Sequence, residues 1–526
     1  MKRILQLLAF GLLAASLHAA APATRPNIVF ILADDLGYGD IGPFGQKIIH
    51  TPTLDRLAHE GMKFTQHYTG SPVCAPARCV LMTGRHPGHA FIRDNREVGG
   101  WYSGLGQFPI PASEVTLASV LKAAGYATGA FGKWGLGGVG SAGDPLHHGF
   151  DHFFGFNDQR PAHNYFPQYL VDDAVRVPLP GNANVVATEE KMQLPAGADP
   201  HDAANYARFI GQQYAPDLCN ERALKFIREN KNHPFFLYYP TTVPHLALQV
   251  PADSLAEYQG KLADQPYIGG NGYLPQQFPH AAYAAMITRM DSDIGRLAQL
   301  IQELGLDDNT IFIFTSDNGA VYPLSGFDPV FFKSNGDLHG YKGDIYEGGI
   351  REPLIVRWKG HVPANQTSTF VTGFEDWMPT LLELAGATNL LPATVDGISF
   401  APTLLGGQQP ARPFLYREFH GYGGQQAVRV GDWKLVRRHL LGTPKKPAAP
   451  TTELFNLGTD PAETADVAAA HPDIVAKLEK ILTEQHTPSP NFRFPLLDKT
   501  PGSTTEFEAD EALPAKLSPA QELLKK

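Results

Sequence analysis

The sequence predicts an α/β protein: a large, mostly parallel sheet sandwiched by helices, followed by a smaller C-terminal α+β domain. Over most of the chain, apolar β-branched runs alternate with helical repeats. Past about residue 405 the pattern changes to shorter strand-like runs. With 526 residues, of which 43% are hydrophobic and 18% charged, the chain is long enough to bury a large core.

Four strand-like runs define the predicted sheet. Each is continuously apolar, which is typical of a strand buried on both faces, and each stops at polar residues or glycine. They span residues 27–33, 127–131, 234–239 and 310–315. Helical repeats lie between them at 117–124, 219–230 and 281–304. Because the carboxyl ends of parallel strands form the ligand crevice of such a sheet, we expect the polar residues after the four runs to converge.

The predicted large domain spans residues 26–404, and the small α+β domain spans 405–488. Short strands at 427–430 and 433–436 and a helix at 472–485 predict the small domain. Residues 489–526 form a Pro-rich and then acidic tail, a composition typical of a disordered arm.

Residues 1–20 have the pattern of a signal peptide. Lys2 and Arg3 precede an apolar run from Ile4 to about Ala15, and small residues follow. The run is too short to span a bilayer, and no later stretch reaches the roughly 20 apolar residues that a membrane helix needs. We therefore expect an exported protein, periplasmic or secreted, without stable membrane insertion. The alternative is an uncleaved N-terminal anchor.

Charge and cysteine content narrow the function classes. The formal net charge of −10 leaves no global basic field, so we expect no nucleic-acid partner. The chain has three cysteines, Cys74, Cys79 and Cys219. A small, odd number of cysteines does not indicate a disulfide framework. Any anionic substrate would have to meet positive charge gathered locally.

The stretch from Ser71 to Arg85 is the most informative in the chain. It contains Cys74-Ala-Pro76-Ala-Arg78, and its prolines predict a helix that begins near Pro76, with Cys74 at the N-terminus of that helix. Taken alone, the short motif is more typical of a buried free thiol beside a solvated arginine.

Together with other separated motifs over roughly residues 26–480, this stretch resembles the type I, formylglycine-dependent sulfatases, which are arylsulfatase-like members of the alkaline phosphatase superfamily. The resemblance implies an alkaline phosphatase-like fold and a sulfatase catalytic domain at 26–404. It also implies that a formylglycine-generating maturation enzyme oxidises Cys74 to 3-oxoalanine, the formylglycine nucleophile.

Two pairs of neighbouring residues with oxygen-bearing side chains predict a metal site. Asp34-Asp35 and Asp317-Asn318 each follow an apolar run, and together they offer carboxylate and amide oxygens, which suit Ca²⁺ or Mg²⁺. A lone Asp pair would more often be a helix cap or a solvated turn. The resemblance favours Ca²⁺ over Mg²⁺ and adds the modified Cys74 as a further ligand.

The resemblance also places the catalytic residues. It puts Lys133, His245 and Lys342 around the sulfate and Arg78 beside the nucleophile, whereas Glu347 and Arg351 are expected to brace their loop. One hydroxyl of hydrated formylglycine would attack sulfur, His245 with Lys342 would protonate the leaving oxygen, and the second hydroxyl would expel sulfate. Where the family commonly has histidine after Gly-Lys-Trp, this chain has Gly135. The sequence therefore assigns no base for regenerating the aldehyde.

Two alternative functions stay open at this point. A phosphatase or phosphodiesterase of the same superfold would need ligands for two zinc ions, and only His339 is an obvious extra candidate. A non-catalytic sulfatase-like binding protein would account for Gly135. For an exported sulfatase we expect a sulfated carbohydrate substrate, although the sequence specifies neither sugar nor sulfate position. Residues 93–96 and 151–170 are as compatible with a sugar pocket as with packing.

Overall fold

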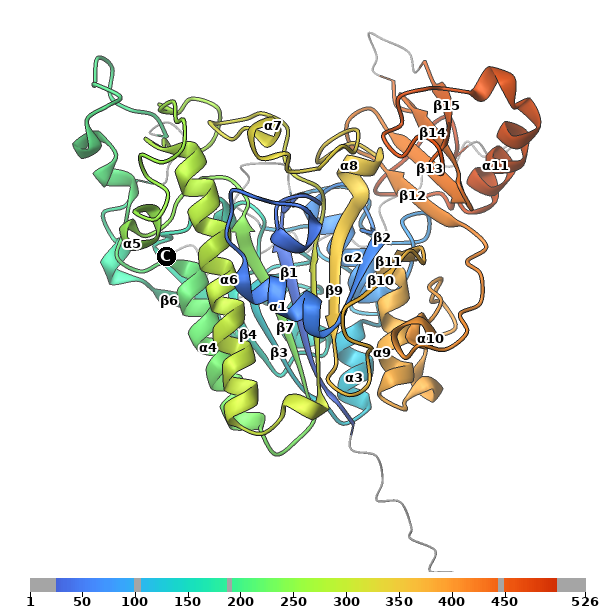
Figure 1. Cartoon of the computed structure of the whole chain (residues 1–526), viewed down its shortest axis with the longest axis horizontal. Helices are drawn as coiled ribbons and strands as arrows, with labels where there is room; N and C mark the ends of the chain where they lie inside the picture. The colour runs from blue at the N-terminus through green and yellow to red at the C-terminus, as the bar shows by residue number, and fades with distance from the viewer. Residues whose placement is uncertain (1–24, 99–105, 187–191, 443–448, 499–526) are drawn as a thin grey trace, which may run out of the picture.

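The computed structural model describes residues 25–98, 106–186, 192–442 and 449–498. Within them, one eleven-stranded sheet has the order β10-β2-β9-β8-β1-β7-β3-β4-β5-β6, with β11 also paired to β2 (Figure 1). Its strands are β1 (Asn27–Asp34), β2 (Met62–Tyr68), β3 (Ala127–Lys133), β4 (His152–Phe156), β5 (Tyr169–Asp172), β6 (Val175–Pro178), β7 (Phe235–Pro244), β8 (Thr310–Ser316), β9 (Arg351–Arg357), β10 (Gln366–Ser368) and β11 (Thr372–Gly373).

The centre of this sheet is parallel. Strands β8, β1, β7, β3 and β4 all run in one direction, so their carboxyl ends meet at one edge. Antiparallel strands flank this core: β9 lies between β8 and β2 on one side, and β5 and β6 continue the other side. The predicted mostly parallel sheet is confirmed, and all four predicted strands belong to its core.

Helices cover both faces of the sheet. Alternate residues of β1 face opposite ways: Val29 packs with one apolar cluster and Phe30 with the other, and both are fully buried. Helices α1 (Pro52–Glu60), α4 (Ala215–Asn230) and α6 (Pro279–Glu303) cover the first face. Helices α2 (Cys74–Thr83), α3 (Leu117–Ala123), α9 (Trp377–Leu384) and α10 (Ala401–Leu404) cover the second. Three one-turn helices lie in loops: α5 (Ala252–Leu255), α7 (Pro329–Phe332) and α8 (Glu347–Ile350).

A second, antiparallel sheet forms the small C-terminal unit. It has the order β12 (Leu415–Phe419), β13 (Gln425–Val430), β14 (Trp433–Arg438) and β15 (Thr451–Asn456). Helix α11 (Pro472–Glu484) packs on it through Leu478 and Leu482. Figure 1 shows this unit, in orange to red, at one end of the large sheet. The predicted small α+β unit is therefore present, and the exact domain boundaries stay predictions.

A buried ion-pair cluster joins the two sheets. Lys434 of β14 places its ammonium nitrogen 2.9 Å from Glu347 of α8 and 2.8 Å from Glu463. Tyr68 at the end of β2 donates its hydroxyl to the same Glu347. These side chains are buried, so the small unit is fixed to the large one by charges that have little access to water.

The ends of the chain fall only partly within the described residues. The predicted signal peptide at 1–20 and tail residues 499–526 lie outside them. Inside them, the start of the predicted tail is packed, because Phe492 belongs to an apolar cluster of the large sheet. Among the described helices, none has the length and apolar character that crossing a membrane requires.

Candidate active site

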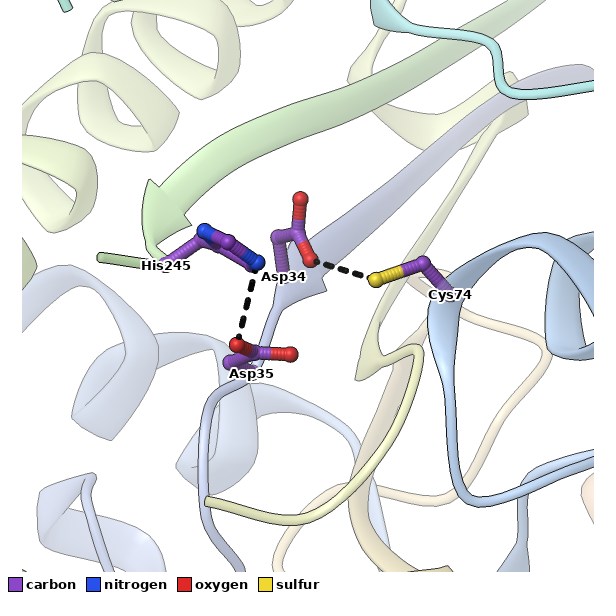
Figure 2. Close-up of side chains that lie close together, drawn as sticks. All are labelled: Asp34, Asp35, Cys74 and His245. Carbon is purple, nitrogen blue, oxygen red and sulfur yellow. Dashed lines mark hydrogen bonds and ion pairs between the residues drawn. The ribbon is translucent and has the colours of Figure 1, made fainter. Parts of the chain in front are cut away.

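The predicted site residues converge at the carboxyl edge of the parallel strands. Asp34 ends β1, Lys133 ends β3, His245 directly follows β7, and Asp317 directly follows β8. Two further segments reach this edge: α2 brings Cys74, and the loop before α8 brings Lys342, whose nitrogen lies 3.6 Å from Sγ of Cys74. Figure 2 shows Asp34, Asp35, Cys74 and His245 side by side.

Cys74 is the first residue of α2. The helix begins two residues before Pro76, with the extended Val73 at its N-cap position, so the predicted placement of Cys74 at the helix N-terminus is confirmed. Asn95 accepts a hydrogen bond of 2.9 Å from the backbone N–H of Ala75 and so holds this turn in place. Cys74 therefore lies at the positive end of a helix, as expected.

Three polar groups surround the Cys74 sulfur. Sγ lies 3.4 Å from Nζ of Lys133, 3.6 Å from Nζ of Lys342 and 3.5 Å from Oδ1 of Asp34. Burial raises the pKa of Cys74 to about 12, although the two lysine charges oppose this. Burial thus disfavours the thiolate, the form in which an unmodified cysteine would attack.

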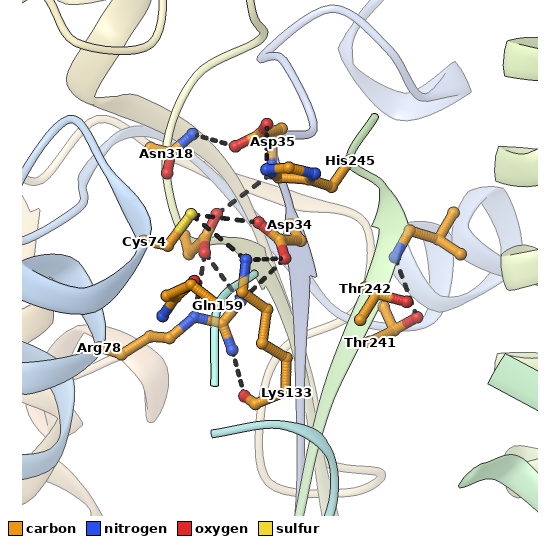
Figure 3. A network of polar contacts seen from close by, with 12 residues as sticks. Asp34, Asp35, Cys74, Arg78, Lys133, Gln159, Thr241, Thr242, His245 and Asn318 are labelled. Atoms are coloured by element: carbon orange, nitrogen blue, oxygen red, sulfur yellow. Dashed lines mark hydrogen bonds and ion pairs between the residues drawn. The ribbon is translucent and has the colours of Figure 1, made fainter. Parts of the chain in front are cut away.

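Arg78 ties the nucleophile helix to the strand ends. Its guanidinium donates to Oδ2 of Asp317 from Nε at 3.1 Å and from Nη2 at 2.8 Å, and it also donates to the carbonyl oxygen of Lys133. One turn apart on α2, Arg78 and Cys74 lie on the same helix face. Figure 3 shows Arg78 below Cys74, within one continuous polar network.

The pKa values of two carboxylates in this network, Asp34 and Asp317, are shifted in opposite directions. Burial acts to raise the pKa of Asp34, but nearby cations, Lys133 foremost, outweigh it and hold the pKa well below its usual range. Burial together with the negative charge of Asp34 raises the pKa of Asp317 to about 7. Repulsion between buried carboxylates of this kind is relieved by a bound cation.

The polar atoms present fit a hard metal ion. Asn318 donates its side-chain amide to Asp35 at 2.8 Å, and its buried Oδ1 has no hydrogen-bond partner among the described residues. An orphaned amide oxygen beside carboxylates offers the ligand chemistry of Ca²⁺ or Mg²⁺. Ligand atoms of Asp34, Asp35, Cys74 and His245 lie within 4.8 Å of one another. Asp317 is not in that group and instead pairs with Arg78, so its role as a ligand stays a prediction.

His245 is a buried member of the same cluster. Its Nε2 is 3.4 Å from Oδ2 of Asp35 and 3.2 Å from Nζ of Lys342. Its Nδ1 donates to the carbonyl oxygen of Leu246, since a carbonyl can only accept. Burial lowers the pKa of His245 to about 4, so the imidazole is neutral and Nε2 is its acceptor nitrogen.

With this geometry in place, three comparisons identify the family. A model of the Sulfatase family matches residues 26–387, and a model described as "N-sulphoglucosamine sulphohydrolase, C-terminal" matches residues 339–488. The chain belongs to the sulfatase family. It is therefore a sulfuric ester hydrolase by descent, which favours the sulfatase hypothesis over a phosphatase. His339, the extra zinc candidate, is exposed and stacks on the ring of Tyr346.

Individual relatives and structures agree with this assignment. Human arylsulfatase A is 34% identical over 507 residues, with 89% of each chain covered. Human N-acetylgalactosamine-6-sulfatase is 31% identical over 502 residues, covering 89% of this chain and 87% of that protein. The crystal structure of Ps i-CgsB, at 27% identity, superposes with a TM-score of 0.68 and covers 88% of this chain and 92% of that one. The expected alkaline phosphatase-like fold is thereby confirmed.

Around the site of this sulfatase, some of the predicted residues make structural contacts, whereas others contact the candidate catalytic residues. Glu347 and Arg351 form an ion pair with each other, with 3.3 Å between nitrogen and oxygen. The pair lies apart from the nucleophile, which agrees with a bracing role. Arg93 is buried and pairs with Glu418 at 2.9 Å, so the 93–96 loop is used at least in part for packing. By contrast, His163 stacks on His245 with ring centroids 4.6 Å apart.

Three residues near the site were not assigned from the sequence. The ring of Tyr273 lies against both His163 and His245, and Gln159 lies against Gly135. Tyr273 and Gln159 lie in loops and His163 ends a one-turn 3-10 helix, and none of these segments shows hydrophobic periodicity. Only the polar and aromatic composition of residues 151–170 pointed toward His163 and Gln159, and no local signal pointed toward Tyr273.

Proposed function

We propose that this protein hydrolyses a sulfate ester of a sulfated carbohydrate, with a formylglycine derived from Cys74 as nucleophile and a bound Ca²⁺, or alternatively Mg²⁺. The observation that carries the proposal is the placement of two lysine nitrogens, from Lys133 and Lys342, at 3.4 and 3.6 Å from the Cys74 sulfur in a buried site. Two cations against one nucleophile atom suit a substrate whose reacting group is an anion.

The chemistry at position 74 needs more than a cysteine. Formylglycine supplies, when hydrated, one hydroxyl to attack sulfur and a second hydroxyl to expel sulfate and restore the aldehyde. Neither a thiol nor a serine hydroxyl has that second group. Lys133 and Arg78 would orient the attacking oxygen, because the Lys133 nitrogen lies 3.4 Å from the Cys74 sulfur and Arg78, one turn along α2, donates to the carbonyl oxygen of Lys133.

Asp34, Asp35, Asp317 and Asn318 would hold the metal ion together with residue 74. The orphaned Oδ1 of Asn318 and the clustered carboxylates support this ligand set. The ion would supply positive charge next to the nucleophile and one sulfate oxygen. Lys133 and Lys342 contact the same carboxylates, at 2.6 Å from Asp34 and 2.8 Å from Asp35.

Lys342 is the better placed of two groups to protonate the leaving oxygen. His245 uses Nδ1 to donate to a carbonyl, so its Nε2 accepts a hydrogen bond from Nζ of Lys342. The mobile proton of this pair therefore resides on Lys342, and His245 orients it. This assigns the proton donor more narrowly than the sequence did, which named His245 first.

The names of relatives support a carbohydrate substrate. Human N-acetylgalactosamine-6-sulfatase carries a sulfated sugar in its name, and Ps i-CgsB has been solved in complex with k-i-k-neocarrahexaose. We therefore propose a sulfated glycan for this protein as well. The test is release of inorganic sulfate from a panel of sulfated oligosaccharides and small aryl sulfates, with the Cys74→Ala variant as control. Cleavage of aryl sulfates alone would contradict the carbohydrate assignment.

Maturation and export complete the proposal. We propose that a formylglycine-generating enzyme modifies Cys74, and that residues 1–20 direct the protein out of the cytoplasm. The N-terminal Lys2-Arg3 and the apolar run after them support export. Cell fractionation with N-terminal sequencing of the mature protein tests it: a new N-terminus near residue 21 is expected, and intact Met1 in the cytoplasm would contradict it.

A further inference from the structure

The side chain of Gln159 is a buried carboxamide. It is 2% exposed, yet neither Nε2 nor Oε1 has a hydrogen-bond partner among the residues that the structure describes. Nearly all buried carboxamides in proteins are hydrogen-bonded, because an unpaired one loses its contacts to water without replacement. Within the described part of the chain, the carboxamide of Gln159 therefore has both a donor and an acceptor free to bind a ligand, a water or a modified group.

The position of Gln159 points to the reacting centre. Strand β3 ends at Lys133, and its pairing with β4 continues through a hydrogen bond of 2.9 Å from the N–H of Gly135 to the carbonyl oxygen of Asn157. This brings Gln159 against Gly135, two residues beyond Lys133. Figure 3 shows the Gln159 side chain between Cys74 and Arg78.

Gly135 is what makes room for this carboxamide. A Cβ atom at position 135 would lie 1.9 Å from Nε2 of Gln159 and 3.7 Å from Cδ of Arg78. Gly135 also has a φ of +79°, in the left-handed region that side chains other than Asn, Asp and His rarely adopt. The carboxamide of Gln159 thus occupies the space that a side chain at 135 would otherwise fill.

We propose that Gln159 is a further active-site residue, whose carboxamide hydrogen-bonds to the hydrated formylglycine at position 74. The amide oxygen accepts from a hydroxyl of the hydrate, and the amide nitrogen donates to the neighbouring oxygen. An amide takes up no proton at neutral pH, so Gln159 holds the hydroxyl in place without acting as its base. This inference rests on the proposed sulfatase function of the same site.

The test compares Gln159→Leu with Gln426→Leu, a matched change at a buried glutamine whose Nε2 donates to Tyr416 and Glu418. We expect Gln159→Leu to lower kcat about 100-fold, with KM, melting temperature and formylglycine content at position 74 unchanged. Gln426→Leu should lower the melting temperature and leave kcat unchanged. If Gln159→Leu lowers the melting temperature and keeps kcat, Gln159 is structural and the inference is wrong.

Two further measurements keep the result decisive. Mass spectrometry of residue 74 in each variant separates catalysis from maturation, and a fall in kcat that only follows lost formylglycine would overturn the inference. The double variant Gly135→His with Gln159→Gly removes the 1.9 Å conflict between a Cβ atom at 135 and Nε2 of Gln159. It should be more active than Gln159→Gly alone. Equal activity of the two variants would count against a shared role of positions 135 and 159. If fully converted wild type cleaves no sulfate ester, the proposed function itself fails, which is a distinct outcome.

Discussion

Lys133 and Asp34 form an ion pair of 2.6 Å in which both side chains are fully buried. Neither charge can be screened by water, so each depends on the other and on the few groups around them. The pair also directs the Lys133 nitrogen to within 3.4 Å of the Cys74 sulfur. One contact thus links the carboxylate cluster to the nucleophile.

Lys133→Met should therefore abolish most activity. Removal of the ammonium group takes a positive charge from the reacting atoms, and we expect kcat to fall at least about 100-fold. The matched control is Lys122→Met, because Lys122 is 48% exposed and pairs with Asp151 at the surface. Steady-state kinetics check both variants, and a Lys133→Met enzyme with kcat within a few-fold of wild type would contradict the assigned role.

Asn318→Leu should weaken metal binding while it keeps the number and branching of the side-chain heavy atoms. The substitution removes the orphaned Oδ1, and we expect the affinity for Ca²⁺ to fall at least about tenfold. Calorimetric titration of chelator-treated protein measures this, and added Ca²⁺ should raise the melting temperature of wild type. Asn220→Leu is the control, because Asn220 also has a buried unpaired Oδ1 but lies on α4. Equal affinities in wild type and Asn318→Leu would exclude Asn318 as a ligand.

Lys434→Met should destabilise the joint between the two sheets. It leaves Glu347 buried beside Glu463 without their shared cation, a change that costs about 3–5 kcal/mol in comparable buried pairs. Urea denaturation measures the loss, and Lys480→Met is the control because Lys480 is 74% exposed. A loss below about 1 kcal/mol, the value of a surface pair, would show that the cluster is weaker than its burial implies.

His486 should make the stability of the small unit depend on pH. Burial opposes its charge, but hydrogen bonds to Asp498 and Glu418 outweigh this and raise its pKa to about 9. A raised pKa stabilises the folded state below the unfolded value of 6.5, and this contribution is lost as the pH rises through about 9.

We therefore expect His486→Gln to cost about 2 kcal/mol at acidic to neutral pH, after allowance for solvent screening. The difference between variant and wild type should disappear at about pH 10.5, where the wild-type imidazole is neutral. Denaturant unfolding at the two pH values measures it. An equal difference at both values would mean that packing, and not charge, carries the effect.

The parallel core of the sheet could be predicted because its strands are long, apolar and buried on both faces. The site residues at or directly after the ends of these strands are Asp34, Lys133, His245 and Asp317. Because the strands run in the same direction, these residues meet at one edge of the sheet. The antiparallel strand β9 was not predicted. It directly follows the one-turn helix α8 and contains Pro353, so its sequence lacks the continuous apolar run of the core strands.

The loop residues of the site could not be predicted from the sequence, for a different reason. The positions of His163, Tyr273 and Gln159 depend on how loops close over the sheet, which no periodicity records. Gly135 did give a signal, as a departure from the family motif, and the structure connects it to Gln159 24 residues further on. The two prolines around Cys74 indicated the start of α2 to within two residues, since Pro76 occupies the third helical position.

The central claim is that Cys74 acts as formylglycine. Mass spectrometry of the peptide containing residue 74, from protein purified from its own host and assayed for sulfate release, tests this claim most directly. The account predicts a dehydrated aldehyde peptide about 18 Da lighter than the thiol form, in proportion to activity. Fully active protein carrying an unmodified Cys74 thiol would contradict it.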